Sequence, residues 1–107
     1  MKAKLFESKH ENQSTEFGVV GVGWDEYEFL IGILMDDLGC ELIEYFEGWS
    51  FEYTLKTHGI EFKVYWDEMT GVWAYAIKNQ ISDINNMLRV VLEKAVEIFN
   101  SRKYFPD

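Results

Sequence analysis

The clearest pattern along the chain is a period-two alternation of apolar and polar side chains over residues 49–55 and again over residues 60–66. The pair His58-Gly59 interrupts it, and two alternating runs joined by a two-residue break are typical of a β-hairpin. Pairing across that turn places the apolar side chains on one face of the hairpin. The expected pairs are Lys56 with Glu61, Leu55 with Phe62, Tyr53 with Val64 and Phe51 with Trp66.

The residues after this hairpin predict a third antiparallel strand. Residues 68–71 are polar or glycine apart from one methionine, and are expected to form the loop that returns the chain. Trp49, Trp66 and Trp73 then share the apolar face, where we expect them in the core, because each large aromatic ring buries about 150–250 Å². The expected pairs are Trp73 with Trp66, Tyr75 with Val64 and Ile77 with Phe62.

Two other segments have the 3.6-residue periodicity of amphipathic helices. The first begins at Asp25, which forms a capping-box pattern with Glu28, and ends at Gly39. The second begins with Ser82 as N-cap, runs to about Ser101, and is followed by Arg102 and Lys103, whose charges suit a helix C-terminus. Its expected buried residues are Ile84, Met87, Leu88, Val91, Ala95, Ile98 and Phe99, opposite Asn85, Asn86, Arg89, Glu93 and Glu97.

The remaining segments are less regular. Residues 7–16 are polar without a period and are expected to form a loop between a short start at residues 3–6 and a strand at residues 17–22. Residues 40–46 favour a strand, although Leu42 and Phe46 would also fit an extension of the helical pattern. The elements together predict a single α+β domain over residues 1–107: an antiparallel β-meander of three to five strands with two amphipathic helices packed on one face.

Charge is concentrated in one part of the chain. Nineteen acids against ten Lys and Arg give a net charge of −9. Residues 10–55 contain eleven of those acids and neither Lys nor Arg. This balance opposes direct binding to nucleic acid or to an anionic membrane, and a block of one charge sign indicates an interaction surface.

The sequence also indicates a compartment. The single cysteine, Cys40, cannot form a disulfide within the chain, and the first residues lack the apolar stretch of a signal peptide. The longest apolar run spans the seven residues Phe29 to Met35, against about 20 for a membrane-spanning helix. We therefore expect a cytoplasmic protein.

No residue pattern indicates a reaction. Cys40 has only His10 and His58 as possible bases, and the sequence places neither of them beside it. No metal-ligand motif is present, and the glycine-spaced run at residues 18–23 matches no phosphate-binding fingerprint. We expect no catalytic residue, no cofactor, no metal site and no enzyme activity.

A binding role accounts better for the acidic segment, with solubility as the plainer alternative. Acidic residues would steer and orient a basic partner, while aromatic side chains would hold it. Trp24, Tyr45 and Tyr65 lie outside the predicted apolar face or beside acids, which suits such anchors. The predicted partner-binding residues are Trp24, Asp25, Glu26, Asp36, Asp37, Glu41, Glu44, Tyr45, Glu47, Trp49 and Glu52.

In its general character the chain resembles small acidic bacterial immunity proteins, including those of contact-dependent growth inhibition systems. The likeness lies in size, acidity and aromatic-rich stretches such as residues 49–53 and 62–67, with no motif that aligns. It implies a cognate nuclease-type toxin as partner, tight binding and no catalysis. Two alternatives stay open: an acidic nucleic-acid mimic that blocks a restriction or CRISPR enzyme, and a small structural or regulatory domain that forms a homodimer.

Overall fold

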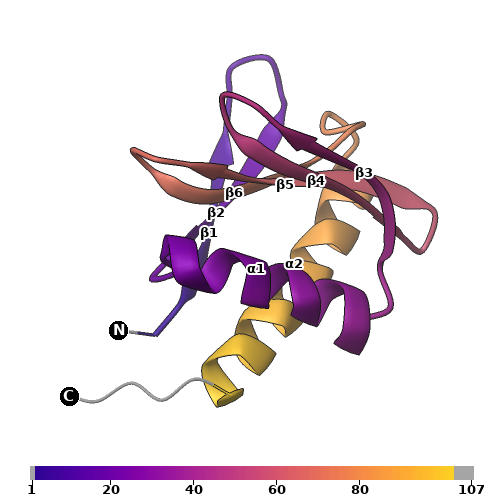
Figure 1. The fold of residues 1–107 in the computed structure, drawn as a ribbon. Helices are drawn as coiled ribbons and strands as arrows, with labels where there is room; N and C mark the ends of the chain where they lie inside the picture. The colour runs from indigo at the N-terminus through magenta and orange to yellow at the C-terminus, as the bar shows by residue number, and fades with distance from the viewer. Residues whose placement is uncertain (1, 103–107) are drawn as a thin grey trace.

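The computed structural model describes residues 2–102, and Lys103, which was expected at the end of the second helix, lies outside them. The fold is α+β: a six-stranded antiparallel sheet with both helices on one side of it (Figure 1). The elements are β1 (Lys4–Lys9), β2 (Thr15–Val20), α1 (Trp24–Gly32), a π-helical turn η1 (Ile33–Asp37), β3 (Glu41–Glu47), β4 (Phe51–Thr57), β5 (Ile60–Asp67), β6 (Gly71–Ala76) and α2 (Ser82–Arg102).

The strands are arranged in the order β1-β2-β6-β5-β4-β3, so that β1 and β3 form the two edges of the sheet. The sheet has one strand more than the upper limit of the predicted meander. The additional strand is β1, because the start expected at residues 3–6 continues into the first three residues of the expected loop and pairs with β2, from Lys4 opposite Val20 to Lys9 opposite Thr15. Its side chains do not alternate between apolar and polar, so no period-two pattern predicts this strand.

The central hairpin has the predicted register. Lys56 pairs with Glu61, and Leu55 pairs with Phe62, both of which are fully buried. His58 and Gly59 form the turn with positive φ angles of 50° and 77°, the backbone conformation that a primed two-residue turn requires. The segment at residues 40–46 is confirmed as a strand, with a bulge between Leu42 and Glu44.

The predicted register of β6 is wrong by one residue. Asp67 pairs with Gly71, so the loop has three residues, and Val72 rather than Trp73 lies opposite Trp66. Gly71 adopts a φ of 90°, which allows this shorter connection. Trp73 and Tyr75 therefore lie on the face of the sheet opposite the helices, and the buried positions belong to Val72, Ala74 and Ala76.

The first helix begins and ends slightly differently from the prediction. Gly23 is its N-cap, and the carboxylate of Glu26 accepts the Gly23 N–H at 3.2 Å, so the reciprocal contact joins residues 23 and 26 instead of 25 and 28. After Gly32 the chain widens into η1. Gly39, with a φ of 70°, then ends the helical segment as expected.

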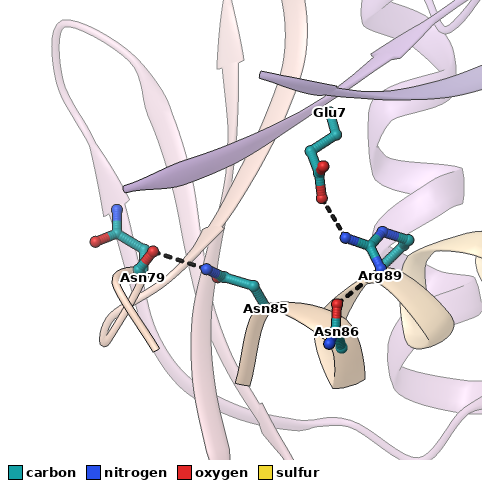
Figure 2. A network of polar contacts seen from close by, with 5 residues as sticks. All are labelled: Glu7, Asn79, Asn85, Asn86 and Arg89. Carbon is teal, nitrogen blue, oxygen red and sulfur yellow. Dashed lines mark hydrogen bonds and ion pairs between the residues drawn. The ribbon is translucent and has the colours of Figure 1, made fainter. Parts of the chain in front are cut away.

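The second helix matches its predicted bounds closely, although Ser82 is its first residue rather than a residue before it. Asn85, expected on the exposed side, is buried and donates to the carbonyl of Asn79 at 2.8 Å, whereas Met87, expected in the core, is exposed. Arg89 bridges Glu7 of β1 and Asn86, as Figure 2 shows. This polar network fixes the start of α2 beneath the β1 strand.

The core lies between the helices and the sheet. Phe17, Phe62 and Leu55 of the sheet are fully buried with Tyr27 and Phe99 of the helices. Trp66 packs at the border of this core, while Trp49 is fully exposed and Trp73 lies on the opposite face of the sheet, so two of the three tryptophans expected in the core lie outside it. Smaller side chains fill the space where α2 lies under β6.

Candidate partner-binding surface

The edge strand β3 is the most exposed regular element of the described chain. All seven of its residues are exposed, whereas most residues of the neighbouring β4 and β5 are buried or half-buried. We call this strand the β3 edge. It carries Glu41, Glu44 and Glu47 between the apolar residues Leu42 (43% exposed), Ile43 (44%), Tyr45 (41%) and Phe46 (49%).

The backbone of the β3 edge has hydrogen-bonding groups directed away from the sheet. The Ile77 N–H donates to the carbonyl of Glu61 at 3.0 Å, so the backbone of Glu61 faces β6. Because this direction alternates along antiparallel strands, the backbone of Phe62 faces β4, and that of Lys56 faces β3. The β3 residues that lie opposite Lys56, Thr54 and Glu52 therefore direct their backbone groups toward β4. The N–H and C=O groups of the residues that alternate with them, Leu42, Tyr45 and Glu47, point outward.

Side chains of the β3 edge are divided between the two faces of the sheet. Glu41, Glu44 and Phe46 lie opposite Lys56, Thr54 and Glu52, on the face without helices. Leu42, Tyr45 and Glu47 lie on the helix side, opposite Leu55, Tyr53 and Phe51. An added strand would therefore meet two carboxylates and the Phe46 ring on the face without helices, and two apolar side chains and the Glu47 carboxylate on the helix side.

On the helix side of the β3 edge, two tyrosines and a glutamate of α1 contact one another. The rings of Tyr45 and Tyr53 lie 4.6 Å apart, and the Tyr53 hydroxyl donates to Glu28 of α1 at 2.9 Å. Partial burial and the hydrogen bond to Glu28 raise the pKa of Tyr53 to about 12. Partial burial and the nearby carboxylates Glu47 and Glu28 also raise the pKa of Tyr45. Both hydroxyls therefore stay neutral at physiological pH.

The face without helices carries a row of aromatic side chains that leads toward the β3 edge. Phe6 packs edge-on against Trp73 with ring centroids 5.3 Å apart, and its ring occupies the space above Gly18, where a Cβ atom would lie 2.2 Å from it. Trp73 lies beside Tyr65, whose hydroxyl donates to Glu16 at 3.1 Å. A shallow hollow of about 190 Å³ lies next to this row, lined by Glu44, Phe46, Glu52, Thr54 and Lys63.

A second aromatic group lies where α1 begins. Trp24 is 45% exposed, and its ring lies 4.7 Å from Phe51 and 5.6 Å from Trp66. These three rings and Glu68 line an open hollow of about 500 Å³. Asp25, which follows Trp24 in the sequence, is exposed in the first turn of α1. The carboxylate of Glu26, in the same turn, accepts the backbone N–H of Gly23.

The predicted partner-binding residues fall into three places. Glu41, Glu44, Tyr45, Glu47, Trp49 and Glu52 lie on β3, β4 and their connecting turn; Trp24, Asp25 and Glu26 lie at the start of α1; and Asp36 and Asp37 lie in η1. The first place is continuous because β3 and β4 are neighbouring strands, and the second reaches β4 through the contact of Trp24 with Phe51.

Asp37 is engaged within the molecule. Its two carboxylate oxygens accept hydrogen bonds from the Arg102 guanidinium at 2.6 and 2.7 Å. These bonds hold the pKa of Asp37 below its usual range. Glu52 is also in contact with a cation, since the amine of Lys63 lies 3.6 Å from it. The pairing with Arg102 ties η1 to the end of α2 and leaves Asp37 poorly suited to steering a partner.

Sequence reasoning missed the apolar residues of this surface. Leu42, Ile43 and Phe46 were not among the predicted partner-binding residues, and Trp73 was placed in the core. A usable signal was present: residues 41–47 interrupt an apolar strand with a glutamate at every third position. Because strand side chains alternate between faces, a glutamate at every third position places charges on both faces, so neither face can be fully buried. Charged side chains of this kind are typical of an edge strand that is protected against pairing.

The described side chains offer no arrangement for metal binding or thiol chemistry. Among residues 2–102, no three His, Cys, Asp or Glu side chains lie where they could jointly hold a metal ion. Cys40 is buried, and burial raises the pKa of its thiol, which disfavours the reactive thiolate. None of the helices in that part of the chain is long and apolar enough to cross a membrane.

Comparison of the chain with protein-family models, with curated proteins and with solved structures found no match.

Proposed function

We propose that this protein is a binding protein that inhibits a basic partner, in the manner of an immunity protein that neutralises a nuclease-type toxin domain. The observation that carries this proposal is the β3 edge, where four large apolar side chains and three glutamates are exposed on one edge strand of the sheet. Exposed apolar surface of this kind is typical of interaction sites.

The surface combines the two properties that a fast and specific inhibitor needs. Its carboxylates attract a basic partner from a distance and orient it during encounter. The aromatic side chains of Tyr45, Phe46 and Trp24 supply the apolar area that slows dissociation. A nuclease must present cations to bind nucleic acid, so an acidic surface that occupies those cations would block its substrate.

Whole-molecule mimicry of nucleic acid is less well supported. Such a mimic needs carboxylates over most of its surface, whereas α2 and its surroundings present Arg89, Lys94 and Arg102. Arg89 pairs with Glu7 and Arg102 pairs with Asp37, so acids and bases are mixed there. The excess negative charge lies in the region of β3, β4 and α1, which favours a local binding surface.

The proposal is tested by capturing partners from a lysate of the organism that encodes the chain, at low and then at high salt. We expect one basic protein to be retained at low salt, because attraction between exposed charges is screened as ionic strength rises. The purified partner is then assayed for nuclease activity with and without this chain. Full nuclease activity in the presence of the bound chain would contradict inhibition, and recovery of the bait alone would contradict the binding role.

A further inference from the structure

We infer that the partner contributes an extended basic segment that adds to the β3 edge as a seventh strand of the sheet. This inference rests on the proposed function and specifies how the partner is held. It is carried by the backbone of the edge: Leu42, Tyr45 and Glu47 direct their N–H and C=O groups away from β4. Strand addition satisfies those groups with main-chain hydrogen bonds, while side-chain contacts set the specificity.

The charges of the edge select a basic occupant over a second copy of this chain. Antiparallel pairing of two β3 edges would bring three glutamates from each copy into one short joint, between molecules that each carry a net charge of −9. Like charges across neighbouring strands are destabilising. The same glutamates therefore disfavour pairing of the edge with a second copy and favour pairing with a cationic strand.

The opposite edge of the sheet lacks this combination. β1 carries Lys4 and Lys9 as well as Glu7. Its helix side is held by α2, since Arg89 pairs with Glu7 and Asn100 makes two hydrogen bonds with the backbone of Ala3, at 2.8 and 3.0 Å. The β3 edge has neither mixed charge nor such a cover, so it is the edge suited to strand addition.

The two faces of the edge define the segment that it would take. On the face without helices, Glu41 and Glu44 call for lysine or arginine side chains. On the helix side, Leu42 and Tyr45 call for apolar side chains. Because strand side chains alternate between faces, the matching segment alternates basic and apolar residues.

The direct test uses a synthetic peptide of alternating lysine and valine, about nine residues long, a usual strand length. Amide hydrogen exchange of this protein is followed residue by residue with NMR. The amides of Leu42, Tyr45 and Glu47 should exchange about tenfold more slowly when the peptide is present at about ten times its Kd. The amides of Glu44 and Phe46, which face β4, should change little. A peptide that alternates glutamate and valine serves as the control.

A backbone variant isolates the outward hydrogen bond. Tyr45→Pro removes the outward N–H, which β4 does not use, and proline is tolerated at sheet edges. Tyr45→Ala removes the same ring and keeps the N–H, so the pair differs mainly in the backbone donor. We expect the peptide to bind Tyr45→Pro about tenfold more weakly than Tyr45→Ala. If Tyr45→Pro does not fold, Glu47→Pro and Glu47→Ala make the same comparison.

The outcomes separate this inference from the proposed function. Equal peptide affinity of the proline and alanine variants, or peptide binding without slower exchange at Leu42, Tyr45 and Glu47, would overturn strand addition. Inhibition of the captured basic partner would survive either result, because it does not require that mode of binding. A dimer of this protein that the proline variant abolishes would overturn the basic occupant in favour of a second copy.

Discussion

Tyr27 connects helix α1 to the middle of the sheet. Its side chain is fully buried, and its hydroxyl lies 2.9 Å from the carbonyl oxygens of both Phe51 and Val64. One hydroxyl has a single hydrogen, so the two carbonyls share it. Burial is the main reason that the pKa of Tyr27 is raised well above its usual range. This residue holds α1, and with it Trp24, against the strands next to the β3 edge.

Replacing Tyr27 by phenylalanine should lower the free energy of unfolding by about 1–2 kcal/mol, because the carbonyls lose a buried donor while the ring stays in place. The free energies are measured by urea denaturation. Tyr53→Phe is the matched control, since its hydroxyl bonds to Glu28 at an exposed position. An equal loss for the two variants would show that the Tyr27 hydroxyl contributes no special stability.

Tyrosine ionisation should make the protein less stable at alkaline pH. The folded pKa of Tyr53 is raised from 10.0 to about 12. A group raised in this way contributes stability that is fully present below its unfolded pKa and is lost as pH rises through the folded pKa. Urea denaturation at several values between pH 9 and 12 should show a falling free energy of unfolding above pH 10, with a smaller fall for Tyr53→Phe. An identical fall in that variant would contradict the role of Tyr53.

At the scale of single elements, the register of β6 decides whether Val72 or Trp73 faces the core. Val72 is 1% exposed beneath the helices, whereas Trp73 lies on the other face and donates its indole N–H to Thr70 at 2.8 Å. Val72→Ala should lower the free energy of unfolding by about 2 kcal/mol through lost burial and a cavity. Trp73→Ala should lower it less, although it removes the larger side chain. The reverse order in urea denaturation would contradict this register.

Local regularity explains which elements could be predicted. The β4–β5 hairpin was predicted residue for residue because its alternation and its two-residue turn are consistent with each other. The length of the next loop depends on whether Gly71 belongs to the turn or to the strand. Composition favoured tryptophan in the core, whereas α2 lies close to β6 and the buried side chains there are Val72, Ala74 and Ala76. That distance is a tertiary property, which alternation along the chain does not contain.

The candidate site was predictable in its charge and less so in its geometry. Glu41, Glu44 and Glu47 were predicted to act together, and the structure places them on one edge strand. The bridge from Asp37 to Arg102 joins residues 65 positions apart, so no local pattern indicated it. The exposure of Leu42 and Phe46 follows from the position of β3 at the end of the strand order, which is known only once all six strands are placed.

At the scale of the whole molecule, reversal of Asp36 and Asp37 is not a clean test of steering. Asp37→Lys would place a second cation beside Arg102 and break their bridge, so it would lower stability as well as change the field. Asp36→Lys alone avoids this. We expect it to slow association with the partner moderately and to leave the thermal unfolding temperature nearly unchanged. A large drop in that temperature would indicate that Asp36 has a structural role.

Position, and not only net charge, should determine the response to charge reversal. The double variant Glu44→Lys with Glu47→Lys changes the β3 edge. The double variant Glu93→Lys with Glu97→Lys makes the same change in net charge at exposed positions on α2. The two therefore match in total charge and differ in where the charge lies, so they separate local steering from general attraction.

The association rate of the captured basic partner, measured at low ionic strength with the wild type and these two double variants, tests the central claim most directly. If the β3 edge is the binding surface, its double variant should associate about tenfold more slowly, while the α2 variant stays within about twofold of the wild type. Equal slowing of both variants would contradict a binding surface at the β3 edge and would leave only the total charge of the molecule as the source of attraction.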